Sequence, residues 1–449
     1  MNAVVLSVLV MLILSVLRVH VVLALFLGAL VGGLTAGLGL EATMVAFQDG
    51  LAGGAKIALS YALLGAFAMA VAHSGLPQLL ANWFIAKLDS ADMSTSQKVA
   101  AWAKWGMLTG VLAMAIMSQN LIPVHIAFIP LLIPPLLVVM NRLRLDRRAM
   151  ACVLTFGLVT TYMFLPIGFG KIFLYDILYG NILKSGLDVS DVPVMQAMWI
   201  PALGMVIGLL LAVGVTYRRP RGYDTTAVVD VEAPKAIDRK KVFIALVAIV
   251  ACFAIQTWLT LIDSAADSLL VGALVGLCIF VVTGAVKFTD AEHVFTGGMK
   301  MMALIGFIMI SAQGFAAVMQ ATGEIGPLVE GTSELFGDNR GMAAFAMLFV
   351  GLLVTMGIGS SFSTLPIITA IYVPLCLALG FSPLATVSII GTAGALGDAG
   401  SPASDSTLGP TAGLNADGQH DHIRDTVIPT FLHFNLPLLA AGWVAAMVL

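Results

Sequence analysis

An interruption of apolar sequence near the end of the chain, at 397–410 (GDAGSPASDSTLGP), carries the oxygen-bearing side chains that a small cation needs. Six of them lie within ten residues, set among Gly and Pro: Asp398, Ser401, Ser404, Asp405, Ser406 and Thr407. Sodium accepts carboxylate, hydroxyl and backbone carbonyl oxygens, and helix-breaking Gly and Pro free such carbonyls. The segment predicts a sodium site with these ligands: Asp398, Ser401, Ser404, Asp405 and Thr407. The two acids, Asp398 and Asp405, could exchange the metal ion for a proton.

The alternative is that this segment is an exposed loop near a membrane face. An apolar run leads directly into it, which favours a position inside the membrane. Ionisable residues at membrane depth are costly and usually functional. Both interpretations stay open at the level of sequence.

Three other interruptions of apolar sequence offer polar groups, namely 118–123 (SQNLIP), 162–171 (YMFLPIGFGK) and 357–364 (GIGSSFST). Backbone inside hydrocarbon must be satisfied internally, so such breaks occur only where they are buried in protein or line a cavity. Ser118 and Asn120 are further candidate cation ligands. Candidate substrate contacts are Asn120, His125, Ser360, Ser361 and Thr364. Each short polar side chain could instead cap a helix, and His125 could be a packing residue.

The elements that must position these residues are membrane helices. Of the 449 residues, 59% are hydrophobic and 10% are charged, whereas soluble domains carry about 25% charged residues. Apolar stretches such as 2–17, 20–40, 242–262 and 426–447 approach the ~20 residues that cross a ~30 Å hydrocarbon core. We therefore expect an all-α, polytopic, multi-pass membrane protein.

One long polar stretch, 217–241, carries seven Lys and Arg residues and divides the chain near its midpoint. If this stretch is cytoplasmic, the basic cluster at 141–148 is also inside and the acidic loops are outside, as the positive-inside bias requires. We predict a first transmembrane half at 1–216, a cytoplasmic linker at 217–241 and a second half at 242–449. The expected location is a bacterial inner (plasma) membrane.

Weak internal similarity relates the two halves. Shifts of 248, 240 and 236 residues align Phe67 with Phe315, Gly75 with Gly323, Pro134 with Pro374 and Pro166 with Pro402. The basic loop 141–148 aligns with the almost uncharged loop 380–384, so equivalent loops face opposite sides. This pattern predicts an inverted-topology repeat, in which each half has about five spans, a re-entrant hairpin and a broken helix. Chance matching of apolar segments is the alternative.

The stretches 118–123 and 357–364 each separate two apolar legs that begin and end on the same side of the membrane. We expect both stretches to be tips of re-entrant hairpins, with legs near 101–117, 124–140, 341–356 and 365–380. Two full spans in each place would satisfy the same topology.

The alignment also pairs Tyr162 with Asp398 and Lys171 with Thr407, so the first half lacks the acid pair. Lys171 instead places a permanent cation beside a break, where it could imitate a bound ion or pair with a substrate carboxylate. Alternatively, its stem snorkels to the nearest interface, with Asp176 as a partner. The two readings are equally compatible with the sequence.

Several functional classes receive no support. The net charge is −3 without a basic face, so no nucleic-acid partner is expected. The four Cys residues lie in apolar runs without C-x-x-C spacing, which argues against disulfides and metal clusters. The chain has no H-E-x-x-H motif or comparable enzyme constellation. We expect no cofactor beyond the coupling ion, Na⁺ and/or H⁺, and no partner beyond a small ion or molecule and the lipid bilayer.

The run GDAGSPASDSTLGPT, from Gly397 to Thr411, resembles the signature of NhaC-type sodium/proton antiporters in the ion-transporter superfamily. The longer string through NADGQHDHIRD resembles a branch that includes histidine and other amino-acid permeases. The resemblance implies an inverted repeat, a midplane site and often a homodimer. It marks as coupling-ion residues Asp398, Ser401, Ser404, Asp405 and Thr407. The chain departs from the signature at Ala399 and Gly400, whose small side chains could leave room for an organic substrate.

We therefore expect a sodium-coupled secondary transporter of the sodium/proton antiporter family that works by alternating access. The alternative is sodium- or proton-coupled symport of a small amino acid, such as histidine, or a carboxylate, with Lys171 or Asn120 contacting its carboxylate. A passive channel is a further alternative, and flux without counter-ion dependence would reveal it.

Overall fold

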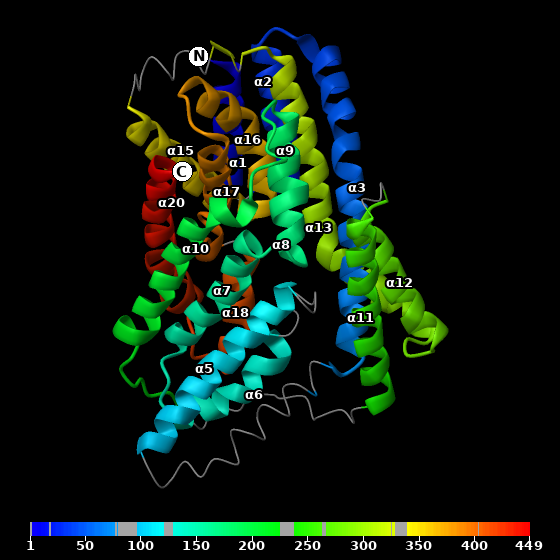
Figure 1. Ribbon diagram of the computed structural model, residues 1–449, viewed down its shortest axis with the longest axis vertical. Coiled ribbons are helices and arrows are strands. Elements are labelled where there is room, and N and C mark those ends of the chain that lie inside the picture. Colours follow the sequence, from blue (N-terminus) through cyan, green and yellow to red (C-terminus); the bar gives the residue numbers. More distant parts are fainter. Residues whose placement is uncertain are drawn as a thin grey trace.

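The computed structural model describes residues 2–17, 19–76, 79, 97–120, 129–224, 238–262, 266–324, 326–327, 339–402 and 404–449, and every regular element in them is helical (Figure 1). The first half contains α1 (Ala3–Val16), α2 (Val21–Thr35), α3 (Gly39–His73), α5 (Gln97–Asn120), α6 (Ile129–Arg142), α7 (Arg147–Phe164), α8 (Phe169–Lys171), a π-helical segment (Ile172–Tyr179), α9 (Gly180–Lys184) and α10 (Val194–Leu211), which continues as π-helix to Thr216.

The second half has the same order of long and short helices. It contains α11 (Arg239–Leu261), α12 (Ser268–Val282), α13 (Phe288–Ala321), α15 (Arg340–Ile358), α16 (Ser361–Ala378), α17 (Pro383–Ala395), a 3₁₀ turn (Asp398–Gly400), α18 (Asp405–Leu414), a π-helical segment (His422–Val427), α19 (Ile428–Thr430), a second π-helical segment (Phe431–Asn435) and α20 (Leu436–Val448).

Several of these helices are long and apolar enough to cross a membrane. Within the described residues, three meet this test alone: Val194–Thr216, Arg239–Leu259 and His422–Val448. A fourth span is the bent pair of Arg147–Phe164 and Phe169–Lys184, which meet at 53°. Shorter apolar helices include α2, α12 and the described parts of α15 and α16. The all-helical membrane architecture expected from the hydropathy is therefore present.

The basic connections lie at one end of the molecule. Figure 1 places the α6–α7 connection, the end of α10 and the start of α11 together at the end far from the N-terminus. We call this the basic end, because it carries residues 141–148 and 217–224. The α16–α17 connection, which includes 380–384, lies toward the other end. The linker residues 225–237 lie outside the described residues.

In each half, one span is interrupted near the middle of the molecule, after α7 in the first half and after α17 in the second. Between α7 and α8, Gly168 has a φ of +60°, and a Cβ there would lie 2.6 Å from the Gln119 carbonyl oxygen at the end of α5. After α17, Gly397 has a φ of +90°, and a Cβ there would lie 2.8 Å from the Met356 backbone nitrogen in α15. Each break is thus packed directly against the end of a preceding helix, at positions that accept only glycine.

The second break is shorter than the sequence suggests. Helix α18 resumes at Asp405 because the Ser404 hydroxyl accepts a hydrogen bond from the Ser406 backbone N–H at 3.0 Å and caps the helix. Thr407 and Pro410, which we expected within the interruption, are therefore helical. The predicted hairpin tip at 357–364 narrows to Gly359 and Ser360. The first tip is described only to Asn120, and residues 121–128 lie outside the described residues.

A buried ion pair at the basic end joins the two halves. The Arg147 guanidinium, at the start of α7, donates to both carboxylate oxygens of Asp417 at 2.6 and 2.5 Å and to the Leu414 carbonyl at 2.9 Å. Burial raises the pKa of Asp417, but the Arg147 guanidinium outweighs it and holds that pKa below its usual value. Because Leu414 ends α18, this pair fixes the C-terminal end of α18 against the start of α7.

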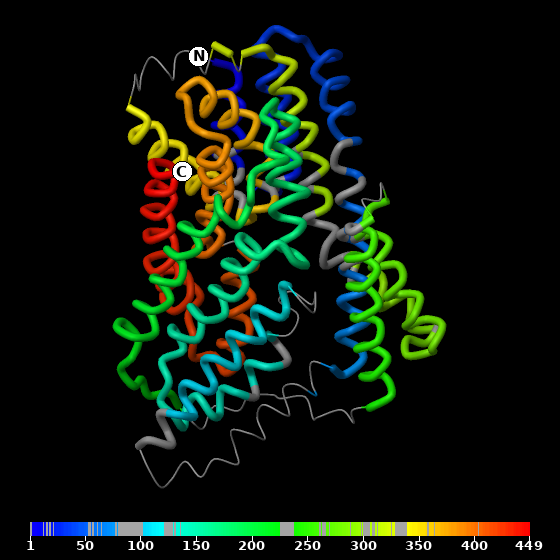
Figure 2. The backbone as a smooth tube through the Cα atoms, in the orientation of Figure 1, coloured from blue at the N-terminus to red at the C-terminus, as the bar shows by residue number. Residues whose placement is uncertain are grey.

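Small residues let α10 and the last span approach closely, as is common between membrane helices. In Figure 2, α20 (red) runs alongside α10 (green) at the edge of the molecule. A Cβ on Gly208 would lie only 1.7 Å from the His433 carbonyl oxygen. The absence of a side chain at Gly208 therefore sets the position of the segment Phe431–Asn435.

We predict that Gly208→Ala destabilises the protein by about 1–3 kcal/mol, the usual cost of overpacking. The measurement is the thermal unfolding midpoint of the purified protein in detergent. Gly214→Ala is the matched control, because it changes the same run of helix where nothing lies within 4 Å of the added Cβ. Equal midpoints for the two variants would contradict the close packing of Gly208.

Candidate cation site

The centre of the site is the carboxylate of Asp398, which hydroxyl groups surround. Tyr162, on the last turn of α7, donates from Oη to Asp398 Oδ2 at 2.5 Å. Ser404 donates to Oδ1 at 2.5 Å, and Ser406 donates to Oδ2 at 3.4 Å. Ser361, at the start of α16, lies 2.7 Å from Tyr162 Oη. Since the single Tyr162 proton points at Asp398, the Ser361 hydroxyl donates to Tyr162.

Asp398 is enclosed but has no cationic partner. Its relative exposure is 6%, and among the described residues no Lys, Arg or His side chain forms an ion pair with it. A buried ionised carboxylate is costly unless a counter-charge compensates it. The pocket of hydroxyl oxygens therefore suits a carboxylate that is neutralised by a small cation or by a proton.

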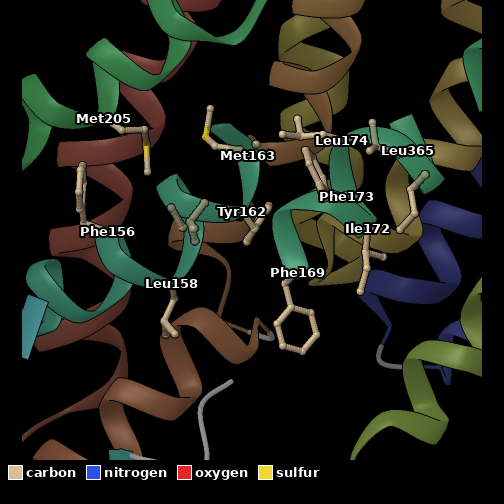
Figure 3. Close-up of a cluster of buried hydrophobic side chains, with 14 of the residues drawn as sticks. Phe156, Leu158, Tyr162, Met163, Phe169, Ile172, Phe173, Leu174, Met205 and Leu365 are labelled. Carbon is tan, nitrogen blue, oxygen red and sulfur yellow. The ribbon is translucent and has the colours of Figure 1, made fainter. Parts of the chain in front are cut away.

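Aromatic rings close one side of this site. The ring of Tyr162 lies 4.8 Å from that of Phe173 and 5.3 Å from that of Phe362, between centroids. Figure 3 shows Tyr162 and Phe173 pointing toward each other within a cluster that also includes Leu174 and Leu365. These apolar groups exclude water and strengthen every electrostatic interaction at Asp398.

The freed backbone around Asp398 is satisfied by neighbouring hydroxyls. Thr407 Oγ1 lies 2.5 Å from the Ser401 carbonyl and 2.9 Å from the Ser404 carbonyl. Ser401 Oγ donates to the Met356 carbonyl at 3.1 Å, and Thr155 in α7 donates to the Ser406 carbonyl at 2.9 Å. Ser401 and Thr407 thus hold the loop in shape, while Ser404 faces the carboxylate directly.

An asparagine holds each of the two breaks. Asn120 donates from Nδ2 to the Ile167 carbonyl at 2.9 Å, and the Gly397 N–H donates to Asn435 Oδ1 at 3.0 Å. Asn120 Oδ1 is buried and accepts no hydrogen bond from the residues that the structure describes. The predicted ligand Asn120 therefore positions the first break and keeps one unpaired oxygen at its tip.

The two acids of the motif have different environments. Asp405 begins α18 and is exposed, whereas Asp398 is buried. The two carboxylates are still close enough to repel each other electrostatically. Asp398 is therefore the enclosed acid of the motif, and Asp405 is the exposed acid beside it.

The remaining predicted residues lie in different environments. Ser118 donates to the Ala115 carbonyl at 2.7 Å and Thr364 donates to the Ser360 carbonyl at 3.0 Å, each within its own helix turn. Lys171 donates to Ser268 Oγ, at the start of α12, at 2.9 Å. His125 lies outside the described residues. Of the hairpin residues, Ser361 is the one that joins the hydroxyl chain to Asp398.

The expected open space at Ala399 and Gly400 is filled. A Cβ on Gly400 would lie 2.6 Å from Asn435 Nδ2 and 2.7 Å from the Phe431 Cα. Ala399 is fully buried. The small side chains accommodate the last span rather than an organic substrate.

Sequence reasoning missed three contributors to the site. Tyr162 was identified only as the residue aligned with Asp398, and that alignment was in fact the signal for their contact. Thr155 and Asn435 were not identified, because Thr155 is a single polar residue within an apolar run and Asn435 is accompanied only by His433 in the run 431–440. Such isolated polar groups at membrane depth are a usable signal.

The fold is similar to that of solved transporters. Comparison with the Alcanivorax borkumensis transporter YdaH gives a TM-score of 0.58, covering 91% of this chain and 89% of that one, at 14% sequence identity. Comparison with MtrF of Neisseria gonorrhoeae, described as illuminating a class of antimetabolite efflux pumps, also gives 0.58, with 92% and 85% covered at 15% identity. At these identities the likeness establishes the fold alone.

Full-length relatives occur in distant bacteria. A membrane protein of Vibrio parahaemolyticus is 54% identical over 100% of both chains, and one of Haemophilus influenzae is 52% identical over 100% of this chain and 99% of its own. A Bacillus subtilis relative named "Putative amino acid transporter YuiF" is 50% identical over 100% of both.

Two family models match the sequence. The model described as "Na+/H+ antiporter family" matches residues 153–443, which include both breaks and Asp398. A second, described as "Na+-H+ antiporter family", matches residues 2–88. The chain is thus a multi-pass membrane protein and a secondary transporter rather than an enzyme, and it belongs to the Na⁺/H⁺ antiporter family.

Proposed function

We propose that this protein is a sodium-coupled secondary transporter in which Asp398 alternately binds Na⁺ and H⁺. The observation that carries the proposal is a buried carboxylate surrounded by hydroxyl groups and without a cationic partner in the described residues. Such a group is stable only when an ion or proton neutralises it. An exchangeable partner is what coupling requires.

The same oxygens can serve both ligands. With Na⁺ bound, the Asp398 carboxylate and the oxygen lone pairs of Ser404, Ser361 and Tyr162 are its candidate ligands, once the hydroxyl protons rotate away. With H⁺ bound, the carboxyl group is neutral and the hydroxyls keep their hydrogen bonds. Binding of the two cations is therefore mutually exclusive, which is the physical basis of antiport. No resident cofactor is needed beyond these coupling ions.

The position of the site between the halves supports alternating access. Tyr162 and Asp398 occupy aligned positions of the two halves and meet directly. The aligned connections 141–148 and 380–384 lie toward opposite ends of the molecule (Figure 1). Both observations support an inverted-topology repeat with its site at the interface of the repeats.

The positive-inside bias makes the basic end cytoplasmic in a bacterial inner membrane. We propose this orientation, the division of the chain into halves at 217–241, and a homodimeric assembly. Asn120, through its unpaired Oδ1, is the candidate for a second cation ligand set in the first half.

A second candidate is sodium-coupled symport of a small amino acid. It is favoured by the Bacillus subtilis relative, which carries the name of an amino acid transporter and is 50% identical throughout. In this case Asp398 binds the driving sodium, and Lys171, Ser360 or Thr364 remain candidate contacts for the organic substrate.

We predict that Asp398→Asn abolishes sodium-driven flux, because the amide keeps the shape of the site but removes its exchangeable charge. The measurement is internal pH and labelled amino-acid uptake in proteoliposomes under an imposed sodium gradient. Sodium-driven proton movement in the wild type supports antiport, and amino-acid uptake without proton movement supports symport.

Two neighbouring variants sharpen this test. Asp405→Asn is expected to retain coupling with weaker sodium affinity, because this acid is exposed. Asp188→Asn, in an exposed connection, is the matched control and is expected to transport normally. If Asp398→Asn transports like Asp188→Asn, Asp398 is not the coupling residue.

We also predict that Tyr162→Phe weakens sodium binding by roughly tenfold to a hundredfold, because it removes a candidate oxygen ligand of the ion, and an interaction of this kind with a charged group is worth about 1.5–3 kcal/mol. The aromatic packing with Phe173 stays in place. Tyr372→Phe is the matched control, since Tyr372 is also buried but donates to the Met347 carbonyl instead. The measurement is the sodium concentration for half-maximal flux, and equal values for both variants would contradict the role of Tyr162.

A further inference from the structure

A chain of hydrogen bonds runs from residues 401–407, which we call the cation segment, toward the basic end. His422 Nε2 lies 2.9 Å from the Pro402 carbonyl, and its Nδ1 lies 2.8 Å from Thr411 Oγ1. Thr411 Oγ1 lies 2.9 Å from Thr426 Oγ1, which in turn lies 2.7 Å from His420 Nε2. Two histidines are therefore joined through two threonine hydroxyls, and one of them contacts the break directly.

The chemistry of these groups limits where the protons lie. A carbonyl oxygen only accepts, so His422 Nε2 must carry a proton. If His422 is neutral, its Nδ1 accepts and the single Thr411 proton must point to it. If His422 is charged, Nδ1 donates to Thr411, whose proton then turns to the Thr407 carbonyl at 2.9 Å or to Thr426. His422 can therefore change charge without losing a hydrogen bond.

Both ends of this arrangement reach the cation segment. Pro402 lies between Ser401 and the Ser404 that donates to Asp398. Thr407, whose carbonyl receives the Thr411 proton, places its own hydroxyl on the Ser401 and Ser404 carbonyls. The charge of His422 thus acts on the segment at two points.

The two histidines of this chain of hydrogen bonds differ in burial. His422 is half-buried, and imidazole is the side chain that changes charge most readily near neutral pH. His420 is fully buried, and burial lowers its pKa to about 4, so that it stays neutral there.

Charged groups lie on the elements that pack against His422. They are Asp398 in the 3₁₀ turn, Asp405 on α18, Arg147 and Arg148 on α7, and Asp421, Arg424 and Asp425 beside His422 itself. Arg147 pairs with Asp417, Arg148 with Asp146, and Arg221 with Asp425 at 2.7 Å. These ion pairs give Asp417, Asp146 and Asp425 a fixed counter-charge, whereas Asp398 itself binds the proton or the cation in the proposed function. Changing His422 alone therefore separates its contribution from that of Asp398.

We propose that His422 is a proton-sensing positioning residue of the cation site, whose charge sets the geometry of residues 401–407 and opposes sodium binding at Asp398. The proposal rests on the proposed sodium site. A charged His422 holds Pro402 more strongly, since charge-assisted hydrogen bonds are roughly twice as strong as neutral ones, and it adds positive charge near the site. By linkage, sodium binding then promotes loss of the His422 proton.

The experiment measures sodium affinity of the full-length protein in detergent between pH 6 and pH 8, together with proton release on sodium binding. In the wild type, affinity is expected to fall as pH falls. His422→Gln keeps a donor for Pro402 and an acceptor for Thr411 but cannot titrate. We expect the change in sodium affinity of this variant across this range to be at least about fivefold smaller than that of the wild type, since fivefold is the lower end of ordinary coupling between sites. We also expect its proton release on sodium binding to decrease.

His433→Gln is the matched control. His433 also makes two hydrogen bonds, to the Pro429 carbonyl and to Thr216, on the same span but outside the chain described above. Its pH profile is expected to match the wild type. A His422→Gln profile that superimposes on both would overturn the proposal, because a merely structural residue leaves the pH dependence unchanged.

Thr411→Val provides the test if His422→Gln does not fold. It removes the Nδ1 partner of His422, so the midpoint of the pH profile must shift, and an unshifted midpoint overturns the proposal. If Asp398→Asn abolishes sodium binding while the His422 variant behaves as wild type, the sodium site stands and the sensing role fails. If the wild type shows no response to sodium, both fail.

Discussion

The need to satisfy broken backbone in an apolar environment determines the construction of this site. Each interrupted helix exposes peptide groups that water cannot reach, so side chains must replace the lost hydrogen bonds. An asparagine does this at both breaks, but in opposite senses. Asn120 donates to a freed carbonyl, whereas Asn435 accepts from the N–H of Gly397. Because Thr407 then covers the carbonyls of residues 401 and 404, the Ser404 hydroxyl is left to face Asp398.

This arrangement makes binding of an ion and the shape of the protein interdependent. The hydroxyl groups around Asp398 come from three separate places: the end of α7, the start of α16 and the residues around the start of α18. In the proposed function, a cation at Asp398 would contact all three and stabilise the arrangement in which they meet. A ligand shifts an equilibrium only by its preference for one state, and a site assembled from different elements provides such a preference.

The sequence was sufficient for the helices and breaks but not for the contacts between them. Hydropathy predicted the membrane spans, and Gly and Pro together with clustered polar residues indicated both interruptions, although Pro366, Pro374 and Pro410 lie within helices. The motif indicated Asp398 and Asp405 equally, and only tertiary packing distinguishes the buried acid from the exposed one. The helix start at Asp405 was predictable, because Ser404 is a favoured N-cap residue. The repeat alignment paired Tyr162 with Asp398, 236 residues apart, but it did not predict that the two side chains meet.

The contrast between Asp398 and the other enclosed acids supports the proposal that Asp398 exchanges a proton for a cation. At the basic end, Asp417 pairs with Arg147, Asp146 with Arg148, and Asp425 with Arg221. Each of these acids has a permanent counter-charge, and the Arg147–Asp417 pair is fully buried, so removing one of its partners is strongly destabilising. Asp398 is as well enclosed, yet hydroxyls alone surround it among the described residues. Hydroxyl groups can donate to a carboxylate or turn their lone pairs to a cation, so they stabilise several charge states of the site. A permanent arginine would favour one state only, and the exchange would stop.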